Sequence, residues 1–332
     1  MRRTAAALAG LALAVPATAR AHHGGAALGM AGPEGPGAAF ETTSALLPQQ
    51  RNLLLFLKTE YVPFRQFSWA DPTNKEYFWF TTLTAGYGIT PWLTVFLGQP
   101  LQVKAQQTLG TSAGLADASV GLAFGFKYDE GFRLVPEKES LDDLLDWHFT
   151  VWASCTLPVG RTTRMDAEGD YFEPEMQSGF GSPSPTAGLA VLKQISADFT
   201  WLFDASYQAF FPHTYPFTRY QFGGETRVDS ALVWRAVAAR NFRLDLAVEA
   251  NFLSLQRDKE QDAAGQLSPL AGSGGSVLYL GGGVRAYWSR LSGSIGLRGP
   301  AWKNLNEQWV QQGSEGLELF RLSAAVSYVF GL

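Results

Sequence analysis

The chain has 332 residues, of which only 17% are charged and 13% are aromatic, and its formal net charge is −4. This balance and the lack of a basic cluster argue against nucleic-acid binding. A single cysteine, Cys155, excludes an intramolecular disulfide and a cysteine-based metal site, and without a phosphate-binding loop the sequence predicts no cofactor. Thirty-five glycines and a mean hydropathy of −0.04, beside so many aromatic residues, are instead typical of a membrane β-barrel.

The N-terminus predicts a secretory signal peptide over residues 1–21. A basic start at residues 1–3 is followed by an apolar run over 5–15, and residues 19–21 (ARA) have the small-x-small pattern of a cleavage site. The apolar run is too short to span a bilayer as a helix, which takes about 20 residues. We therefore expect an exported protein that enters a membrane, if at all, through strands.

Residues 22–50 do not carry the pattern of membrane strands. Gly, Ala and Pro dominate up to Gly37, and the residues that follow are more apolar. Two interpretations stay open for this N-terminal segment, a plug inside a barrel or a flexible periplasmic tail. His22 and His23 stand at the predicted mature N-terminus, where imidazole and amine nitrogens are good ligands for copper or nickel. They are weak metal candidates, because adjacent histidines in a tail are also ordinary solvent-exposed spacers.

From residue 51 onwards the chain alternates between apolar and polar residues with period 2, which places the two sets on opposite faces of a sheet. Over 241–255, for example, Leu246 and Val248 fall on one face, and Asp245 and Glu249 fall on the other. The pattern predicts an antiparallel up-and-down barrel of about 12 strands over 51–332, an even number as in bacterial barrels. The predicted strands are 51–64, 76–90, 92–105, 115–129, 146–158, 185–195, 197–211, 218–236, 241–255, 276–287, 289–298 and 316–330.

Two further features favour a membrane barrel over a soluble β-sandwich. The predicted strands are longer than the usual sandwich strand of about 5 or 6 residues, and they are long enough to cross a bilayer at a tilt. Short turns also alternate with long links, as expected if the last strand ends in the periplasm. The long links that we expect outside are 65–75, 106–114, 159–184, 256–275 and 299–315. The exception is 130–145, an acidic insert that would lie in the periplasm and that could form a short helix.

Charged side chains on the polar faces would point into the lumen of such a barrel. The first candidates for contact with a substrate are Arg227, Asp229, Arg243, Asp245 and Glu249, which lie on two consecutive strands. The alternative is that these charges form ion pairs that fix the barrel wall. Other charged positions in the same register are Lys58, Glu60, Asp204, Glu225, Arg235, Arg285, Arg298 and Arg321.

Aromatic residues also fall on the predicted lumen face. Trp152 and Phe210 are candidates for lining a route for hydrophobic molecules. The alternative is that both only fill the lumen.

Several segments resemble the MetA-pathway phenol-degradation family of outer-membrane proteins. Residues 114–128 (GLADASVGLAFGFKY) resemble the family's GxGDxxxGLKY strand, 177–183 (QSGFGSP) its Gly-rich loop, and 273–284 a third signature. The segment 43–61 is similar to the family's entry segment. The resemblance implies a plugged barrel that transports hydrophobic small molecules, in outline like the long-chain fatty-acid and toluene transporters.

The sequence departs from this family pattern at three places. Ala116 stands beside the aspartate where a glycine is usual, and Phe180 stands where a threonine is common. The chain ends at 330–332 (FGL) rather than on a terminal aromatic residue, which leaves Phe330 as the expected assembly signal.

The sequence thus predicts an outer-membrane channel for passive passage of small, mainly hydrophobic molecules. The partners expected are outer-membrane lipid, the small-molecule substrate and the barrel-assembly machinery during insertion. A structural or surface-interaction barrel with an occluded lumen is the alternative. An outer-membrane hydrolase is a third, weaker reading, because His148 and His213 have no obvious Ser and acidic partner in the strand map and no catalytic residue is predicted.

Overall fold

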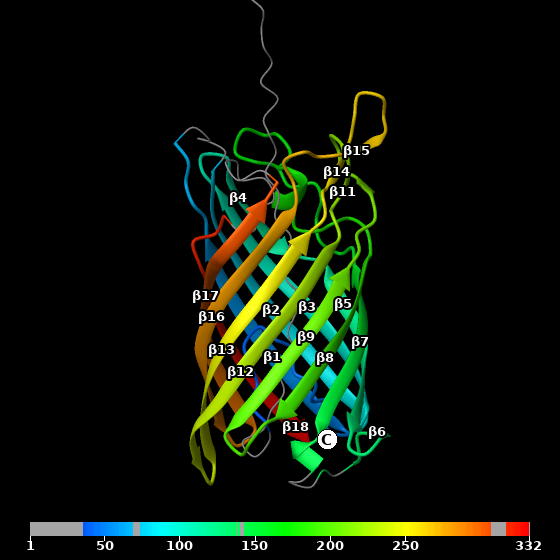
Figure 1. Ribbon diagram of the computed structural model, residues 1–332. Coiled ribbons are helices and arrows are strands. Elements are labelled where there is room, and N and C mark those ends of the chain that lie inside the picture. Colours follow the sequence, from blue (N-terminus) through cyan, green and yellow to red (C-terminus); the bar gives the residue numbers. More distant parts are fainter. Residues whose placement is uncertain (1–35, 69–73, 138, 140–142, 307–316, 332) are drawn as a thin grey trace, which may run out of the picture.

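The computed structural model describes residues 36–68, 74–137, 139, 143–306 and 317–331, which form a closed antiparallel β-barrel of twelve long strands (Figure 1). The predicted fold is therefore confirmed. The long strands are β1 (Asn52–Pro63), β2 (Lys75–Thr90), β3 (Leu93–Gln106), β5 (Ala118–Tyr128), β7 (Trp147–Leu157), β8 (Ser184–Gln194), β9 (Phe199–Gln208), β12 (Glu225–Ala239), β13 (Phe242–Leu255), β16 (Gly275–Trp288), β17 (Leu291–Leu305) and β18 (Arg321–Gly331).

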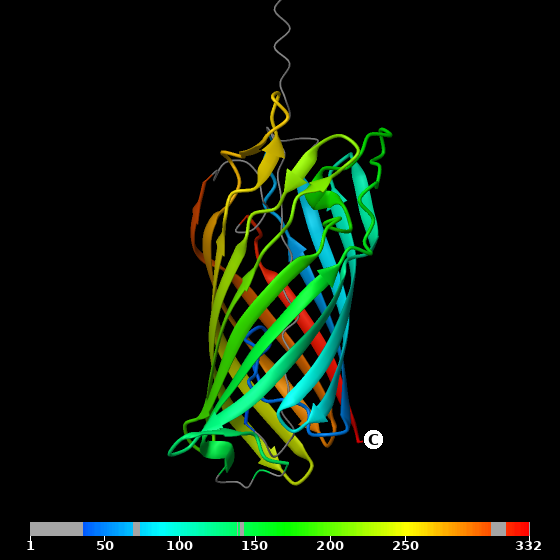
Figure 2. The same cartoon turned by 90° about the vertical axis from the view of Figure 1, so that its right-hand side faces the viewer.

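Each long strand pairs with its sequence neighbour, and the first pairs with the last. The β1–β18 register begins at Asn52 opposite Gly331, and this pairing closes the barrel. Closure leaves no open edge on which another chain could add. Short turns and the C-terminus lie at one end, here called the turn end, and the longer links lie at the other, the loop end (Figures 1 and 2).

The remaining elements are short. β4 (Gly110–Leu115) continues β3 as a hairpin, and β6 (Phe132–Leu134) pairs with the last residues of β5. A small sheet at the loop end joins β10 (His213–Thr214), β11 (Arg219–Gln221), β14 (Lys259–Gln261) and β15 (Leu267–Pro269). Two 3₁₀ turns are present, η1 (Asp143–Leu145) and η2 (Pro174–Met176). No helix among the described residues is long and apolar enough to cross a membrane.

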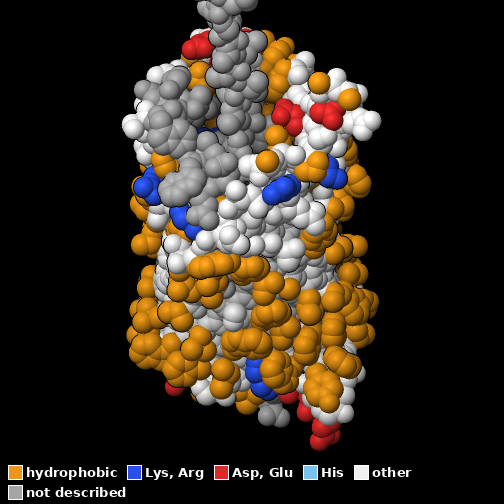
Figure 3. All heavy atoms as spheres, turned by 45° about the horizontal axis from the view of Figure 1, so that its top comes forward, with side chains coloured by type: hydrophobic (Ala, Val, Ile, Leu, Met, Phe, Trp, Pro, Cys, Tyr) orange, Lys and Arg blue, Asp and Glu red, His pale blue; other side chains and the backbone are white. Residues whose placement is uncertain are grey.

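The outside of the barrel is apolar and the inside is mostly polar. In β13, Leu246 and Val248 are exposed, whereas Asp245 and Glu249 are buried in the lumen. Val248 is 61% exposed, and comparable aliphatic side chains occupy the outer face of nearly every long strand. Hydrophobic side chains cover the outer wall in Figure 3. Such a surface is unfavourable in water and favourable in the hydrocarbon of a bilayer.

The structure corrects the predicted strand 218–236. β12 begins only at Glu225, after two glycines that leave no room for a Cβ atom, Gly223 beside the backbone of Gln256 and Gly224 beside the Tyr207 hydroxyl. The alternation predicted that Tyr220 and Phe222 lie on the outward face of this strand, and that prediction is wrong. They are buried at the loop end in an aromatic cluster.

The predicted link 106–114 also differs from the expectation, whereas the acidic insert agrees with it. Residues 106–114 are not a free loop but mostly the β3–β4 hairpin. In the acidic insert 130–145, η1 is the short helix. The neighbouring residues contact the barrel wall, since Glu139 Oε1 lies 2.7 Å from His148 Nε2 and Asp146 pairs with Lys127 at 2.9 Å. Residues 138 and 140–142 lie outside the described part of the chain.

Candidate functional site

Residues 36–50 of the predicted N-terminal segment lie inside the barrel at its turn end (Figure 2). Ala39, Phe40 and Ala45 form a small core with the inner wall of β8, β9, β12 and β13. We call residues 36–48 the inner segment. The earlier residues 22–35, including His22 and His23, lie outside the described part of the chain, so the full extent of a plug and the metal candidates stay predictions.

Carboxylates of the wall hold the backbone of the inner segment. Glu249 accepts hydrogen bonds from the backbone N–H of Phe40 at 2.6 Å and of Thr42 at 2.9 Å, and Asp204 accepts one from the N–H of Thr43 at 2.6 Å. A backbone acceptor of the segment is also bound, since Arg285 donates a hydrogen bond to the carbonyl of Ala39 at 2.7 Å. These contacts satisfy backbone groups that no regular element pairs, which buried backbone requires.

Several charges in this half of the lumen pair with one another. Arg243 forms a bidentate pair with Asp245, with both distances 2.6 Å, and its guanidinium lies over the Tyr287 ring at 5.1 Å. Glu41 of the inner segment meets Lys58 at 2.7 Å and Arg298 at 3.2 Å. Geometry of this kind fits charges that fix a structure, because each charge already has a partner in a solvent-poor lumen.

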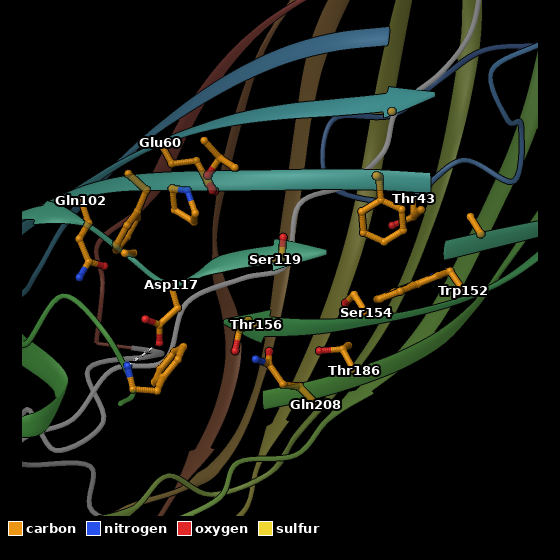
Figure 4. A pocket seen from close by; sticks show the side chains of 18 of the residues that line it. Thr43, Glu60, Gln102, Asp117, Ser119, Trp152, Ser154, Thr156, Thr186 and Gln208 are labelled. Atoms are coloured by element: carbon orange, nitrogen blue, oxygen red, sulfur yellow. Dashed lines mark hydrogen bonds between the residues drawn. The ribbon is translucent and has the colours of Figure 1, made fainter. Parts of the chain in front are cut away.

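Above the inner segment the barrel encloses a cavity with about 1560 Å³ of non-atom space, counted with its solvent-open part (Figure 4). Its floor is residues 43–48 of the inner segment, and its wall is the inner face of β1–β3, β5 and β7–β9. We call the link 158–183 the inner loop. Part of this loop, together with Phe222, forms the roof of the cavity. The cavity therefore lies in the lumen between two chain segments at opposite ends, and part of it is open to solvent.

The cavity wall carries few charges. One register row runs across β3, β5, β7, β8 and β9. The row consists of Phe96, Gly121, Ser154, Thr186 and Gln208. Ser154, Thr156, Thr186 and Gln208 form one group in Figure 4. The apolar part of the lining includes Phe80, Phe96, Trp152, Phe180 and Phe222. An apolar site with a few uncharged polar groups is the usual composition of a small-molecule pocket.

Two aromatic rings of the cavity wall occupy the space left by glycines. A Cβ atom at Gly188 would lie 2.6 Å from two carbon atoms of the Trp152 indole and 2.7 Å from its nitrogen. A Cβ at Gly121 would collide with Phe96 in the same way. The glycines thus leave room for these rings close to the backbone of the wall.

The inner loop is fastened into the barrel by buried ionic contacts. Lys75 of β2 pairs with Glu175 of η2 at 3.1 Å, and both side chains are fully buried. Lys104 donates to the carbonyls of Glu175 and Gln177, at 2.5 and 2.8 Å. Gln102 adds a hydrogen bond from its amide to the carbonyl of Gln177 at 3.0 Å. These contacts hold the roof over the cavity.

Asp117, between β4 and β5, binds both ends of the inner loop. Its carboxylate accepts hydrogen bonds from the backbone N–H of Gly160 at 2.8 Å and of Phe180 at 2.7 Å. Figure 4 shows the Asp117 side chain at the edge of the cavity. Burial raises the pKa of this carboxyl above its ordinary value, and the two N–H donors and the Lys104 ammonium oppose the rise. Asp117 belongs to the segment whose sequence resembles the family strand.

The seven predicted substrate-contacting residues fall into three groups in the structure. Trp152 lines the cavity, and Phe210 lies behind the roof in the aromatic cluster of the loop end. Arg227 pairs with Glu225 at 2.6 Å. The other four are lumen residues of β12 and β13 outside the cavity lining, namely Asp229, Arg243, Asp245 and Glu249. A contact of any of the seven with a substrate stays a prediction.

Sequence reasoning missed the hydroxyl-rich wall. Ser154, Thr186 and Gln208 are uncharged, so the charge pattern of the sequence does not single them out. A signal was present, since the inward positions of β5, β7 and β8 are mainly Ser, Thr, Gly and Ala, whereas those of β12 and β13 are more often charged. This contrast divides the lumen into a charged, tightly paired half and a neutral, open half.

Neither described histidine has the surroundings of a hydrolase. His148 is buried at the turn end, where Nε2 meets Glu139 and Nδ1 lies 3.2 Å from the carbonyl of Asp146. His213 stacks on Tyr215 with ring centres 4.8 Å apart, and burial lowers its pKa. Neither makes a hydrogen bond to a serine of the described chain. The described residues also contain no group of His, Cys, Asp and Glu arranged to hold a metal.

The comparisons with known proteins identify the fold. No family model matches the chain, and no curated protein matches it in sequence. Among solved structures it is similar to the COG4313 outer membrane channel from Pseudomonas putida F1, with a TM-score of 0.61, 10% identity and coverage of 85% of this chain and 96% of that chain. This likeness shows the fold of an outer-membrane β-barrel.

Two further barrels match less well. The NanC porin has a TM-score of 0.43 at 11% identity, covering 82% of this chain and 98% of that one. The CymD monoaromatic hydrocarbon channel has a TM-score of 0.36 at 10% identity, covering 85% and 89%.

Proposed function

We propose that this protein is an outer-membrane channel for the passive passage of small, mainly hydrophobic molecules. The observation that carries the proposal is the lumen cavity, which is lined mainly by apolar and uncharged polar groups and bounded by the inner segment and the inner loop. Such a lining binds apolar molecules by removing their surface from water, at about 25 cal/mol per Å². The apolar outer wall supports a location in a bilayer.

The proposed route passes two chain segments that narrow the lumen. A molecule that enters from the loop end passes the inner loop, rests in the cavity and leaves past the inner segment. Passage requires that at least one of these segments shifts, and both are held by discrete polar contacts rather than by a continuous sheet. Segments with few regular backbone pairings are the parts of a fold that open at the lowest cost.

Three supports come from likeness and sequence. The COG4313 barrel is described as an outer membrane channel. The resemblance to the MetA-pathway phenol-degradation proteins adds the expectation of hydrophobic substrates. The predicted signal peptide, residues 1–21, adds export to the cell envelope, after which the barrel-assembly machinery would insert the chain, with Phe330 on the outer face of β18 as its expected signal.

Ion conductance in a planar bilayer tests the proposal. We expect the mature full-length barrel to be nearly silent and a variant without residues 22–50 to conduct steadily, because the inner segment would then leave the lumen. The refolded state of both proteins is checked by their heat-dependent gel migration. If both proteins stay silent, the lumen is filled by its own side chains and the channel proposal fails.

The alternative is a structural or surface-interaction barrel with an occluded lumen. Its specific support is the extent of internal pairing, since the charged half of the lumen holds the inner segment on several strands. It predicts silence in both conductance experiments, together with loss of partner binding on deletion of loop-end residues.

A further inference from the structure

We propose that the cavity selects neutral molecules that combine an apolar ring with one hydrogen-bond-accepting group, and that Ser154, Thr186 and Gln208 bind that group. The inference rests on the proposed function and names its substrate class. It starts from the register row of the cavity wall, in which these three residues are direct neighbours. Ser154 lies opposite Thr186 on β8, and Thr186 lies opposite Gln208 on β9.

The polar ends of these side chains are available to a ligand. None of the three side chains forms a hydrogen bond to another described residue, whereas the lumen charges are extensively paired. Trp152 lies two residues before Ser154 on β7, on the same face, and its indole adds a buried N–H without a partner in the described chain. Directly opposed residues on neighbouring strands have Cβ atoms only about 4.5–5.5 Å apart. The hydroxyls and the amide can therefore converge on one acceptor atom.

The apolar body has a place in the same row. Phe96 lies on β3 at the other end of the row, with its ring pressed onto Gly121, and Gly121 is the neighbour of Ser154. Phe180 and Phe222, with ring centres 5.1 Å apart, cover the cavity from the roof. A ring bound against Phe96 would thus direct a substituent toward the hydroxyls of Ser154 and Thr186.

Charge argues against anionic ligands. The lining contains three carboxylates, Glu60, Asp117 and Glu175, and only two cations, Lys104 and Arg321. Lys104 already donates to two carbonyls of the inner loop, and Arg321 pairs with Glu318 at 2.9 Å. A carboxylate ligand would lose its hydration without gaining an uncommitted positive partner among the described residues, which is strongly unfavourable. A pure hydrocarbon would bind, but it would leave the wall hydroxyls without a bound partner.

Three probes of similar size separate these classes. Acetophenone carries a carbonyl acceptor, ethylbenzene lacks one, and benzoate is an anion. Binding of each is measured by calorimetry on the full barrel in lipid nanodiscs, with the heat of empty nanodiscs subtracted. We expect acetophenone to bind about five- to tenfold more tightly than ethylbenzene, the effect of one or two neutral hydrogen bonds, and benzoate not to bind measurably.

Variants assign the effect to the wall. Thr186→Val keeps the shape and removes the hydroxyl, so we expect it to reduce acetophenone affinity about three- to tenfold and to leave ethylbenzene unchanged. Trp152→Phe tests the indole N–H in the same way. Thr226→Val is the matched control, because Thr226 is exposed on the outer face of β12.

The outcomes distinguish the inference from the function. Equal binding of acetophenone and ethylbenzene, unaffected by Thr186→Val, overturns the inference and leaves a channel for hydrocarbons intact. Preferred binding of benzoate overturns it as well. Binding of none of the probes also overturns it, and the conductance experiment then decides separately whether the barrel is a channel.

Discussion

The Glu249 carboxylate binds Thr42 twice, since its Oε2 accepts both the backbone N–H and the side-chain hydroxyl, each at 2.9 Å. Its Oε1 accepts the N–H of Phe40 at 2.6 Å. One buried side chain of β13 therefore collects several donors of the inner segment. A carboxylate suits this position because it has only acceptor sites, and hydrogen bonds to a charged group are stronger than neutral ones.

Replacing this carboxylate by an amide should loosen the inner segment. In Glu249→Gln the new NH₂ group would face backbone donors, so we expect docking to weaken by about 1–3 kcal/mol. In planar bilayers the variant should show frequent opening events where the parent protein is nearly silent.

The control for this experiment is Glu76→Gln, because Glu76 is exposed on β2. Glu76→Gln should behave like the parent. Unchanged silence of Glu249→Gln, in a barrel that has folded, would show that the inner segment does not depend on this carboxylate.

The buried pair of Lys75 and Glu175 should decide how firmly the inner loop is docked. Removing one partner leaves the other charge buried and unpaired, which costs about 3–5 kcal/mol, whereas replacing both by apolar residues is often close to neutral. We therefore expect Lys75→Met to expose the loop and the double variant Lys75→Met/Glu175→Leu to restore it. The rate of tryptic cleavage after the exposed Arg161 measures this exposure.

Lys259→Met serves as the reference for the protease experiment, since Lys259 is an exposed residue of β14. Equal cleavage rates in Lys75→Met and the parent would contradict a role of the pair in docking. A double variant that is cleaved as fast as the single one would mean that the charge itself, and not the unpaired partner, matters.

The loop should dock more firmly in acid because of Asp117. Burial raises the pKa of this carboxyl in the docked state above its ordinary value. The sign follows from linkage, since protonation is then easier in the docked state than in the undocked one. The contribution of Asp117 to docking is complete below the ordinary aspartate pKa and is lost as the pH rises through the elevated one. Channel opening should accordingly be less frequent at pH 4 than at pH 7.

Asp117→Asn provides the comparison, because an amide does not titrate. Its opening frequency should lose this pH dependence, although its docking is weaker than that of the parent at both pH values. If opening of the parent protein increases on acidification, the assigned role of Asp117 is wrong.

Gly188 should be intolerant of any side chain. The Cβ of Gly188→Ala would lie 2.6–2.7 Å from three indole atoms, so Trp152 must leave the wall and enter the cavity. We expect a loss of stability of about 1–3 kcal/mol, as for other overpacked interiors, and a several-fold weaker binding of acetophenone. Gly131→Ala is the control, since nothing lies within 4 Å of its added Cβ. Binding and thermal unfolding equal to those of the parent would show that the indole position is adjustable.

The sequence by itself determined the barrel. Leu246 and Val248 alternate with Asp245 and Glu249, and this pattern predicts a wall with one apolar and one polar face. The spacing of short turns and long links predicts that such strands follow one another around the barrel. Alternation is a local property, so it can be read without knowing which strands are neighbours. It failed at Tyr220 and Phe222, where a break at Gly223 changes the phase and no local rule shows where the chain turns away.

Only the tertiary structure decided what fills the lumen. Whether residues 36–48 lie inside the barrel depends on contacts such as Phe40 with Glu249, which are separated by 209 positions in sequence. Likewise, Ser154, Thr186 and Gln208 become one polar surface only through the register of three strands. Period 2 shows that a side chain points inward, but the partner it meets there is set by closure of the ring and by the path of the segments folded into it.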